Sequence, residues 1–280
     1  MKIIECPRDA MQGIQTFIPT NKKIAYLNQL LTVGFDTLDF GSFVSPKAIP
    51  QMKDTAEVVS QLDVSRSKTK LLAIVANTRG AQEAAQFDQI SYLGFPLSIS
   101  ETFQQRNTNK TIIEALNTLE EIQNECQRSN KALVTYISMG FGNPYKDPYD
   151  EAVVSQFAGI LSAMGVTIIS LADTIGVSKP DQITSLFKQV TTTFPKIEFG
   201  VHLHSRPESV IEKIEAAYKA GCKRFDGALK GFGGCPMAKD ELVGNMPTES
   251  IINYLTGKGE NLSIVQNQLD KSLIMAAEIF

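Results

Sequence analysis

Short apolar runs alternate with longer amphipathic segments along the whole chain. The runs are rich in β-branched and aliphatic residues, as in "KLLAIVA" at 70–76 and "TIISLAD" at 167–173. The segments between them carry apolar residues at helical spacing, and several begin after turn-forming residues such as Pro19-Thr20-Asn21. An alternation of strand and helix is typical of a parallel sheet whose strands are joined by helical crossovers.

The pattern predicts eight strand and helix units. The expected strands lie at Lys2–Glu5, Thr37–Gly41, 70–76, within Ile90–Ile99, 132–139, 167–173, 197–204 and 224–229. The expected helices lie around Asn21–Val33, Thr55–Leu62, Arg79–Gln86, Lys110–Arg128, Asp150–Gly165, Pro180–Phe194 and Pro207–Ala220, and after Pro247. Eight units close a TIM barrel, and the length of 280 residues fits one barrel of about 250 residues with little left over.

A doubly wound open sheet is the alternative that such an alternation allows. It is disfavoured because no Gly-x-Gly-x-x-Gly follows the first strand, and the nearest glycine-rich stretch, "GFGGCP" at 231–236, follows the eighth. We therefore predict an α/β protein in which residues 1–280 form a single TIM-barrel catalytic domain, with extra helices at its C-terminal end.

Composition and charge indicate the cellular compartment and disfavour nucleic acid and membrane as partners. The net charge of −3 and the pI near 5.6 provide no basic field for nucleic acid. No run approaches the roughly 18 apolar residues of a membrane span, and the N-terminal residues are too charged for a signal peptide. The four cysteines form no C-x-x-C pair, which is typical of free thiols in a reducing compartment. We expect a cytoplasmic protein.

The two histidines of the chain lie two positions apart, at His202 and His204 near the end of the seventh strand. Side chains at i and i+2 of a strand point to the same face, so both imidazoles can reach one metal ion. A hydrogen-bonded pair in the barrel interior is the other interpretation. In a TIM barrel the carboxyl ends of the strands form the catalytic face, and Asp9 follows the first strand as a natural anionic ligand.

Three other polar groups at strand ends have two interpretations each. Arg8, beside Asp9, suits an oxygen that gains negative charge during a reaction, but Arg-Asp is also a common loop ion pair or helix cap. Asp173 could act in the site or cap the next helix. Cys235 could be a buried filler or a thiol on a mobile glycine-flanked loop over the site.

Taken together, these segments resemble one family, the hydroxymethylglutaryl-CoA lyases. The similar stretches are "ECPRDAMQ" at 5–12, "SFVSPKAIPQM" at 42–52, "ISLADTIGVS" at 169–178, "HLH" at 202–204 and "GFGGCPMAKDELVGN" at 231–245. They occur in the family's order and cover nearly the whole chain. The combination of the second-strand loop with Gly-Gly-Cys-Pro is specific, whereas Arg-Asp or His-x-His alone would be weak.

The resemblance implies a divalent-metal-dependent lyase that splits 3-hydroxy-3-methylglutaryl-CoA into acetyl-CoA and acetoacetate, a reaction of leucine degradation. It implies Mg²⁺ or Mn²⁺ held by Asp9, His202, His204 and Asn245. It also implies that Arg8 stabilises an enolate, that Asp173 takes part in proton transfer and that Cys235 lies on a closing loop. Gln12 falls where the family keeps a polar group beside the substrate, and family members are commonly homodimers.

This chain departs from the family pattern at several positions. Ser205-Arg206 replaces the usual Asp-Thr after the second histidine, Asp39 replaces a glutamate, and Ala10 replaces a glycine. The departures keep two alternatives open. One is a related Claisen-type synthase or 2-oxo acid aldolase, although those synthases usually carry Gly-x-Gly-Glu-Arg in the eighth unit. The other is a catalytically silent barrel that binds metal or acyl-CoA.

Overall fold

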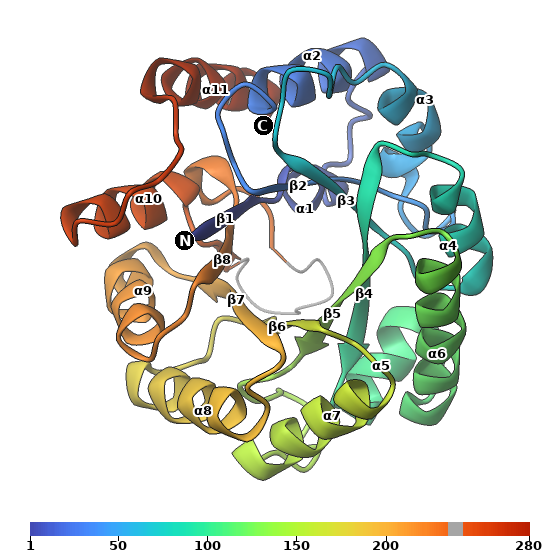
Figure 1. The fold of residues 1–280 in the computed structure, drawn as a ribbon, viewed down its shortest axis with the longest axis vertical. Helices are drawn as coiled ribbons and strands as arrows, with labels where there is room; N and C mark the ends of the chain where they lie inside the picture. Colours follow the sequence, from blue (N-terminus) through green and yellow to red (C-terminus); the bar gives the residue numbers. More distant parts are fainter. Residues whose placement is uncertain (235–242) are drawn as a thin grey trace.

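Eight parallel strands pair edge to edge around a closed barrel in the computed structural model, which describes residues 1–234 and 243–280 (Figure 1). The strands are β1 (Lys2–Glu5), β2 (Thr37–Ser42), β3 (Lys70–Ile74), β4 (Ile90–Ser98), β5 (Ala132–Ser138), β6 (Ile168–Asp173), β7 (Glu198–Ser205) and β8 (Arg224–Gly227). Each strand pairs with its sequence neighbours, and β8 pairs with β1 to close the ring. The predicted TIM barrel is confirmed.

The strands are apolar on both faces because both faces are covered. Every residue of β2 and β6 is buried. Inside the barrel, one cluster is built from Leu72, Tyr92 and Tyr136 together with other interior side chains. Outside it, a larger apolar cluster fills the space between the strands and the helices. Parallel strands covered in this way read as nearly continuous apolar runs.

Most helices lie around the outside of the ring, and the first lies within its outline beside β2 (Figure 1). The helices are α1 (Pro7–Gln12), α2 (Thr20–Leu30), α3 (Thr55–Ser60), α4 (Thr78–Ala85), α5 (Glu101–Thr108), α6 (Ile112–Arg128), α7 (Glu151–Ala163), α8 (Pro180–Thr193), α9 (Val210–Lys219), α10 (Thr248–Gly257) and α11 (Gln266–Ile279). Side-chain caps set several of their starts. Asn77 accepts a hydrogen bond from the Gly80 amide, and Asp150 accepts one from the Val153 amide, both at 2.8 Å.

Three elements differ from the sequence expectation. α1 follows β1 after a single residue, with Pro7 in its first turn, so Arg8 and Asp9 lie on a helix and not in a loop. α5 precedes the expected long helix α6 as a separate element. A two-residue strand, β9 (Gly244–Asn245), pairs antiparallel with the end of β7. These elements are too short to show a periodic pattern in the sequence.

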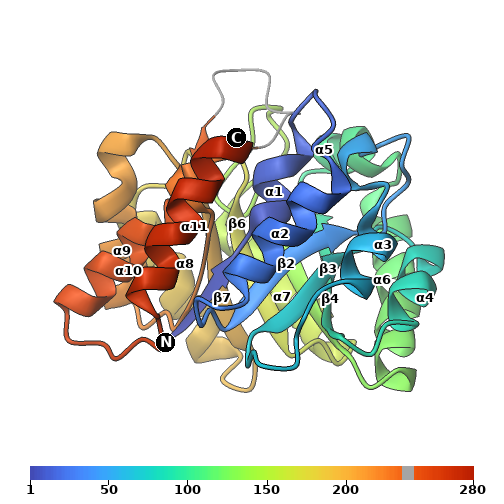
Figure 2. The same cartoon turned by 90° about the horizontal axis from the view of Figure 1, so that it is seen from above.

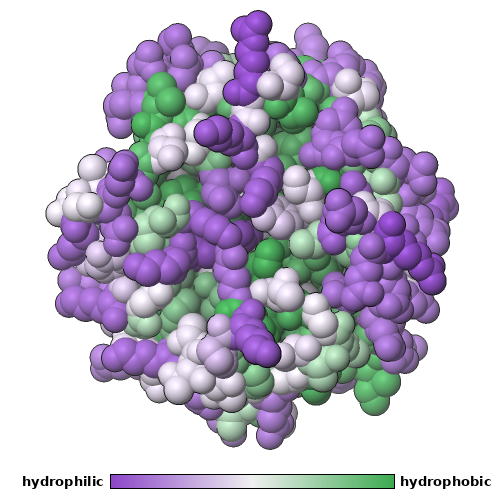
Figure 3. All heavy atoms as spheres, in the orientation of Figure 1, coloured by the Kyte–Doolittle hydropathy of each residue, from purple (hydrophilic) through white to green (hydrophobic). Residues whose placement is uncertain are grey.

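The two C-terminal helices extend the barrel, as predicted. α11 lies along α2 (Figure 2), and Gln29 Nε2 donates a hydrogen bond of 3.1 Å to the carbonyl oxygen of Gln268. Figure 3 shows one face of the molecule, where polar side chains spread across the middle and apolar side chains lie scattered between them. Among the described helices, none has the length and apolarity that a bilayer crossing requires.

Candidate metal centre and active site

Three barrel elements bring the predicted ligands to one place. Asp9 comes from α1, His202 and His204 come from β7, and Asn245 comes from β9, where its backbone is paired with His204. One ligand atom each from Asp9, His202 and His204 lies within 4.8 Å of the others. The two imidazole rings are 5.3 Å apart at their centroids. The structure therefore gathers residues that are almost two hundred positions apart in the sequence.

The His204 ring is held so that one nitrogen is left for a metal ion. The Nδ1 atom of His204 lies 3.0 Å from the carbonyl oxygen of Thr174, which leaves Nε2 for a ligand. That Nε2 atom is buried and has no hydrogen-bond partner among the described residues. Because a buried polar atom is normally paired, an unpaired imidazole nitrogen beside a carboxylate fits a divalent cation. The donor set of two nitrogens and a carboxylate oxygen suits Mg²⁺, Mn²⁺ or Zn²⁺.

Electrostatics keeps His204 and Asp9 in their metal-binding forms. Burial and the neighbouring His202 lower the pKa of His204 to about 4, so its imidazole is neutral near pH 7. Burial opposes the charge of Asp9, but the Arg8 guanidinium and the two histidines outweigh it and lower the pKa of that carboxyl below its usual value. A neutral imidazole and an ionised carboxylate are the forms that bind a cation.

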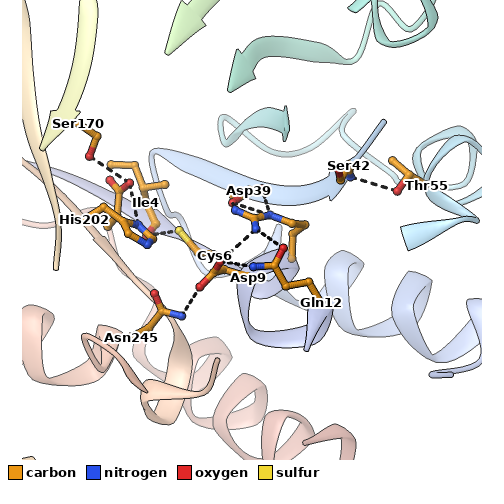
Figure 4. Close-up of polar contacts among 12 residues, drawn as sticks. Ile4, Cys6, Asp9, Gln12, Asp39, Ser42, Thr55, Ser170, His202 and Asn245 are labelled. Carbon is orange, nitrogen blue, oxygen red and sulfur yellow. Dashed lines mark hydrogen bonds and ion pairs between the residues drawn. The ribbon is translucent and has the colours of Figure 1, made fainter. Parts of the chain in front are cut away.

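Asn245 is hydrogen-bonded to Asp9 through its amide nitrogen. Nδ2 donates to Asp9 Oδ2 at 2.6 Å and to the carbonyl oxygen of Phe232 at 2.9 Å (Figure 4). Both amide hydrogens are thereby used, and the amide oxygen accepts no hydrogen bond from the described residues. Asn245 therefore lies beside Asp9, and its role as a metal ligand through the amide oxygen stays a prediction.

Arg8 joins the metal group to the second strand. Its Nε and Nη2 atoms form a fork on the Asp39 carboxylate, with a shortest distance of 2.6 Å, and its Nη1 donates to Asp9 Oδ1 at 3.0 Å and to Gln12 Oε1 at 2.8 Å. Gln12 Nε2 in turn donates to Asp9 Oδ1 at 2.8 Å. Asp39, in place of the family's glutamate, thus reaches Arg8 despite its shorter side chain. The ion-pair interpretation of Arg8 is confirmed, and the same contacts orient it toward the metal group.

Asp173 has a full set of partners within the protein. Its carboxylate accepts hydrogen bonds from the amides of Val177 and Ser178, from the Ser178 hydroxyl at 2.5 Å, and from Lys213 Nζ at 2.9 Å. Lys213 Nζ also donates to the carbonyl oxygens of Gly176 and His204. These contacts favour an ion pair that holds the loop after β6. The role of Asp173 in proton transfer stays a prediction.

Two residues in the site were missed from the sequence. Asp226 on β8 faces His202, with Oδ2 3.4 Å from Nδ1, and although burial opposes charge on the ring, Asp226 raises the pKa of His202. Lys213 holds Asp173 from α9. Asp226 could have been found from the sequence, because an aspartate near the end of the eighth strand lies on the catalytic face. Lys213 could not, because nothing in the sequence shows that a lysine inside a helix is buried. Cys235, predicted for the closing loop, lies outside the described residues.

Comparisons with known proteins find similarity along nearly the whole chain. A family model described as HMGL-like matches residues 2–280. Hydroxymethylglutaryl-CoA lyase YngG of Bacillus subtilis is 32% identical over 272 residues, which cover 97% of this chain and 89% of that protein. The human cytoplasmic 3-hydroxy-3-methylglutaryl-CoA lyase is 32% identical over 267 residues, or 94% of this chain and 71% of that protein.

Solved structures of HMG-CoA lyases also resemble this chain. An HMG-CoA lyase from Acinetobacter baumannii, in complex with coenzyme A and 3-methylmalate, superposes with a TM-score of 0.90 at 30% identity and covers 99% of this chain and 91% of that one. The Bacillus subtilis HMG-CoA lyase superposes with a TM-score of 0.91 at 31% identity, covering 99% and 92%. The family model and the relatives match along nearly the whole length, and the chain belongs to the HMGL-like family.

Proposed function

We propose that this protein is a divalent-metal-dependent lyase that cleaves 3-hydroxy-3-methylglutaryl-CoA to acetyl-CoA and acetoacetate. The observation that carries the proposal is the group of Asp9, His202 and His204 at the carboxyl ends of the strands, with Arg8 bonded to it. Relatives named as hydroxymethylglutaryl-CoA lyases at 32% identity support this substrate. The complex of one relative with coenzyme A supports a thioester partner.

The reaction sets three demands on the protein. The hydroxyl on C3 must lose its proton, the C2–C3 bond must break, and the enolate of acetyl-CoA must gain a proton on carbon. A bound Mg²⁺ or Mn²⁺ would supply Lewis acidity that makes the hydroxyl proton easier to remove. We assign its ligands as Asp9, His202, His204 and the amide oxygen of Asn245.

Arg8 supplies the permanent positive charge that a developing enolate oxygen needs. Its guanidinium is 8% exposed and is held by Asp39, Asp9 and Gln12, so it is preorganised at little further cost. Gln12 is half-buried beside it and positions both Arg8 and Asp9 for the substrate. We assign protonation of the enolate carbon to the Cys235 thiol, and removal of the hydroxyl proton to Asp173 or a ligand histidine.

The direct test is incubation of the purified protein with the thioester and Mg²⁺ or Mn²⁺, with acetoacetate as the measured product. We expect turnover that is lost on chelation and restored by either ion. Asp9→Asn should abolish it, whereas Asp63→Asn, a matched change at an exposed aspartate, should not. Full metal occupancy without acetoacetate would favour the silent barrel, and condensation of acetyl-CoA with a 2-oxo acid would favour the synthase.

The proton-transfer assignments need variants of their own. Cys235→Ala should lower turnover by orders of magnitude and leave Mn²⁺ binding intact, since the thiol is not a ligand in this scheme. Asp173→Asn should lower the unfolding temperature in any case, because it leaves the buried Lys213 ammonium without its partner. Lys213→Met breaks the same ion pair but keeps the carboxyl group, so turnover that is retained in folded Lys213→Met and lost in folded Asp173→Asn would support proton transfer by Asp173, and equal loss in both would assign Asp173 to the ion pair. Homodimer formation stays a prediction from the family resemblance, and a cytoplasmic location stays a prediction from the sequence.

A further inference from the structure

A second group of ligand atoms lies one layer deeper in the barrel than the first. Cys6 follows β1 directly, and its amide donates to the carbonyl oxygen of Gly227 on β8 at 2.8 Å. His202 on β7 is paired in register with Asp226 on β8. These pairings bring one ligand atom each from Cys6, His202 and Asp226 within 4.8 Å of one another. Figure 4 shows the Cys6 sulfur beside the His202 imidazole.

The facing atoms of this group lack good partners within the described protein. His202 Nδ1 and Asp226 Oδ1 are buried without any hydrogen bond. Asp226 Oδ2 is 3.5 Å from the Ser170 hydroxyl and 3.4 Å from His202 Nδ1, and the Cys6 thiol reaches the Ile4 carbonyl oxygen only at 3.8 Å. Cys6, Asp226 and His202 are 0%, 2% and 9% exposed. Buried polar groups are rarely left so poorly paired.

The Arg224 guanidinium attracts the Asp226 carboxylate but forms no hydrogen bond with it. Arg224 lies two residues earlier on β8, and its closest carboxylate is Glu198, at 3.8 Å. A buried carboxylate that has no hydrogen-bonded cation and lies beside a thiol and an imidazole can bind a divalent cation.

The spacing of the atoms also suits a metal ion. A distance of 3.4 Å between His202 Nδ1 and Asp226 Oδ2 is long for a hydrogen bond. In a tetrahedral zinc site with bonds of about 2.0–2.1 Å to nitrogen and oxygen, two ligand atoms lie about 3.3 Å apart. The distance between His202 Nδ1 and Asp226 Oδ2 is close to that value. A cysteine, a histidine and a carboxylate together select softer ions such as Zn²⁺ or Co²⁺ over Mg²⁺.

We propose that Cys6, His202 and Asp226 form a second cation site for a thiophilic divalent ion, beneath the Asp9, His202 and His204 group. The two sites share the His202 imidazole, whose Nδ1 faces the lower site. Binding in the lower site converts the Cys6 thiol to a thiolate and releases its proton to solvent. Because His202 can bind through both ring nitrogens only as an imidazolate, filling both sites also releases its ring proton to solvent, and an ion in the lower site lowers the affinity of the upper site for Mg²⁺ or Mn²⁺.

Cobalt provides the test, because Co²⁺ bound by a thiolate has a charge-transfer band in the near ultraviolet. Metal-free, full-length protein is titrated with Co²⁺. The wild type is expected to develop the band at saturation, and Cys6→Ala is expected to lose it. Cys222→Ala is the matched control, since Cys222 is an equally buried free thiol and its removal should leave the band unchanged.

Asp226→Asn tests the same site without removing the sulfur, and should weaken Co²⁺ binding at least tenfold. Circular dichroism confirms that each variant is folded. A band that survives in Cys6→Ala, that is lost in Cys235→Ala, or that never forms in the wild type would overturn the proposal. Mn²⁺ binding and acetoacetate formation by the wild type report on the proposed lyase, so the two proposals can fail separately.

Discussion

The carboxyl group of Glu5 at the end of β1 has an unusual environment that predicts a specific dependence of stability on pH. It is fully buried, and it accepts hydrogen bonds from the Leu229 amide at 2.9 Å and from the Thr248 hydroxyl at 2.5 Å. Burial raises its pKa from 4.5 to about 8, although both hydrogen bonds act in the opposite direction. Glu5 is therefore protonated in the folded protein at neutral pH and ionised in the unfolded chain.

The sign and size of the effect follow from that difference. Below pH 4.5 both states bear the proton, so Glu5 adds no pH dependence. Between pH 4.5 and about 8 the folded state binds more protons, and its stability falls by about 1.4 kcal/mol per pH unit. The difference between the two pKa values is about 3.5 units, which corresponds to about 5 kcal/mol before the curve levels off above pH 8.

Glu5→Gln removes this titration while keeping the shape of the side chain. We expect the variant to match the wild type near pH 5 and to exceed its free energy of unfolding by about 3 kcal/mol at pH 7, because 2.5 units separate pH 7 from 4.5. The measurement is urea unfolding followed by circular dichroism at half-unit steps of pH. Glu57→Gln, at an exposed position on α3, is the matched control. Parallel curves for Glu5→Gln and the wild type would refute the reasoning.

Three further predictions follow from single contacts. Lys213→Met should lower the free energy of unfolding by about 3–5 kcal/mol in urea unfolding, because it leaves the buried Asp173 carboxyl group without its cation. Loss of the exposed pair of Lys219 and Glu215 should have a much smaller effect in the same assay. Arg8→Lys should lower turnover at least tenfold, because one ammonium cannot form the guanidinium fork, and Mn²⁺ titration should still show binding. Asp150→Ala should lower the unfolding temperature through loss of about 1 kcal/mol of helix capping, and an unchanged temperature would contradict the cap.

The site shows where prediction from sequence works and where it stops. His202, His204 and Asp9 could be placed together because strand alternation puts both imidazoles on one face and barrel closure gathers the strand ends. The prediction of Asn245 as a ligand rested on family resemblance alone, because the two-residue strand that pairs it with His204 is too short to show a periodic pattern. The partners of Asp173 were beyond reach, because a lysine on α9 reads as a surface residue until the helix is docked.

The order of apolar runs and amphipathic segments by itself determined the eight strands, the barrel and the face that bears the chemistry, because these depend on local periodicity and on the number of units. Only the tertiary structure decided which polar groups meet. Arg8 binds Asp39, and His202 faces Asp226 and Cys6, through pairings between strands distant in sequence. Such contacts depend on register and on side-chain reach of a few ångströms, which no pattern along a single chain encodes.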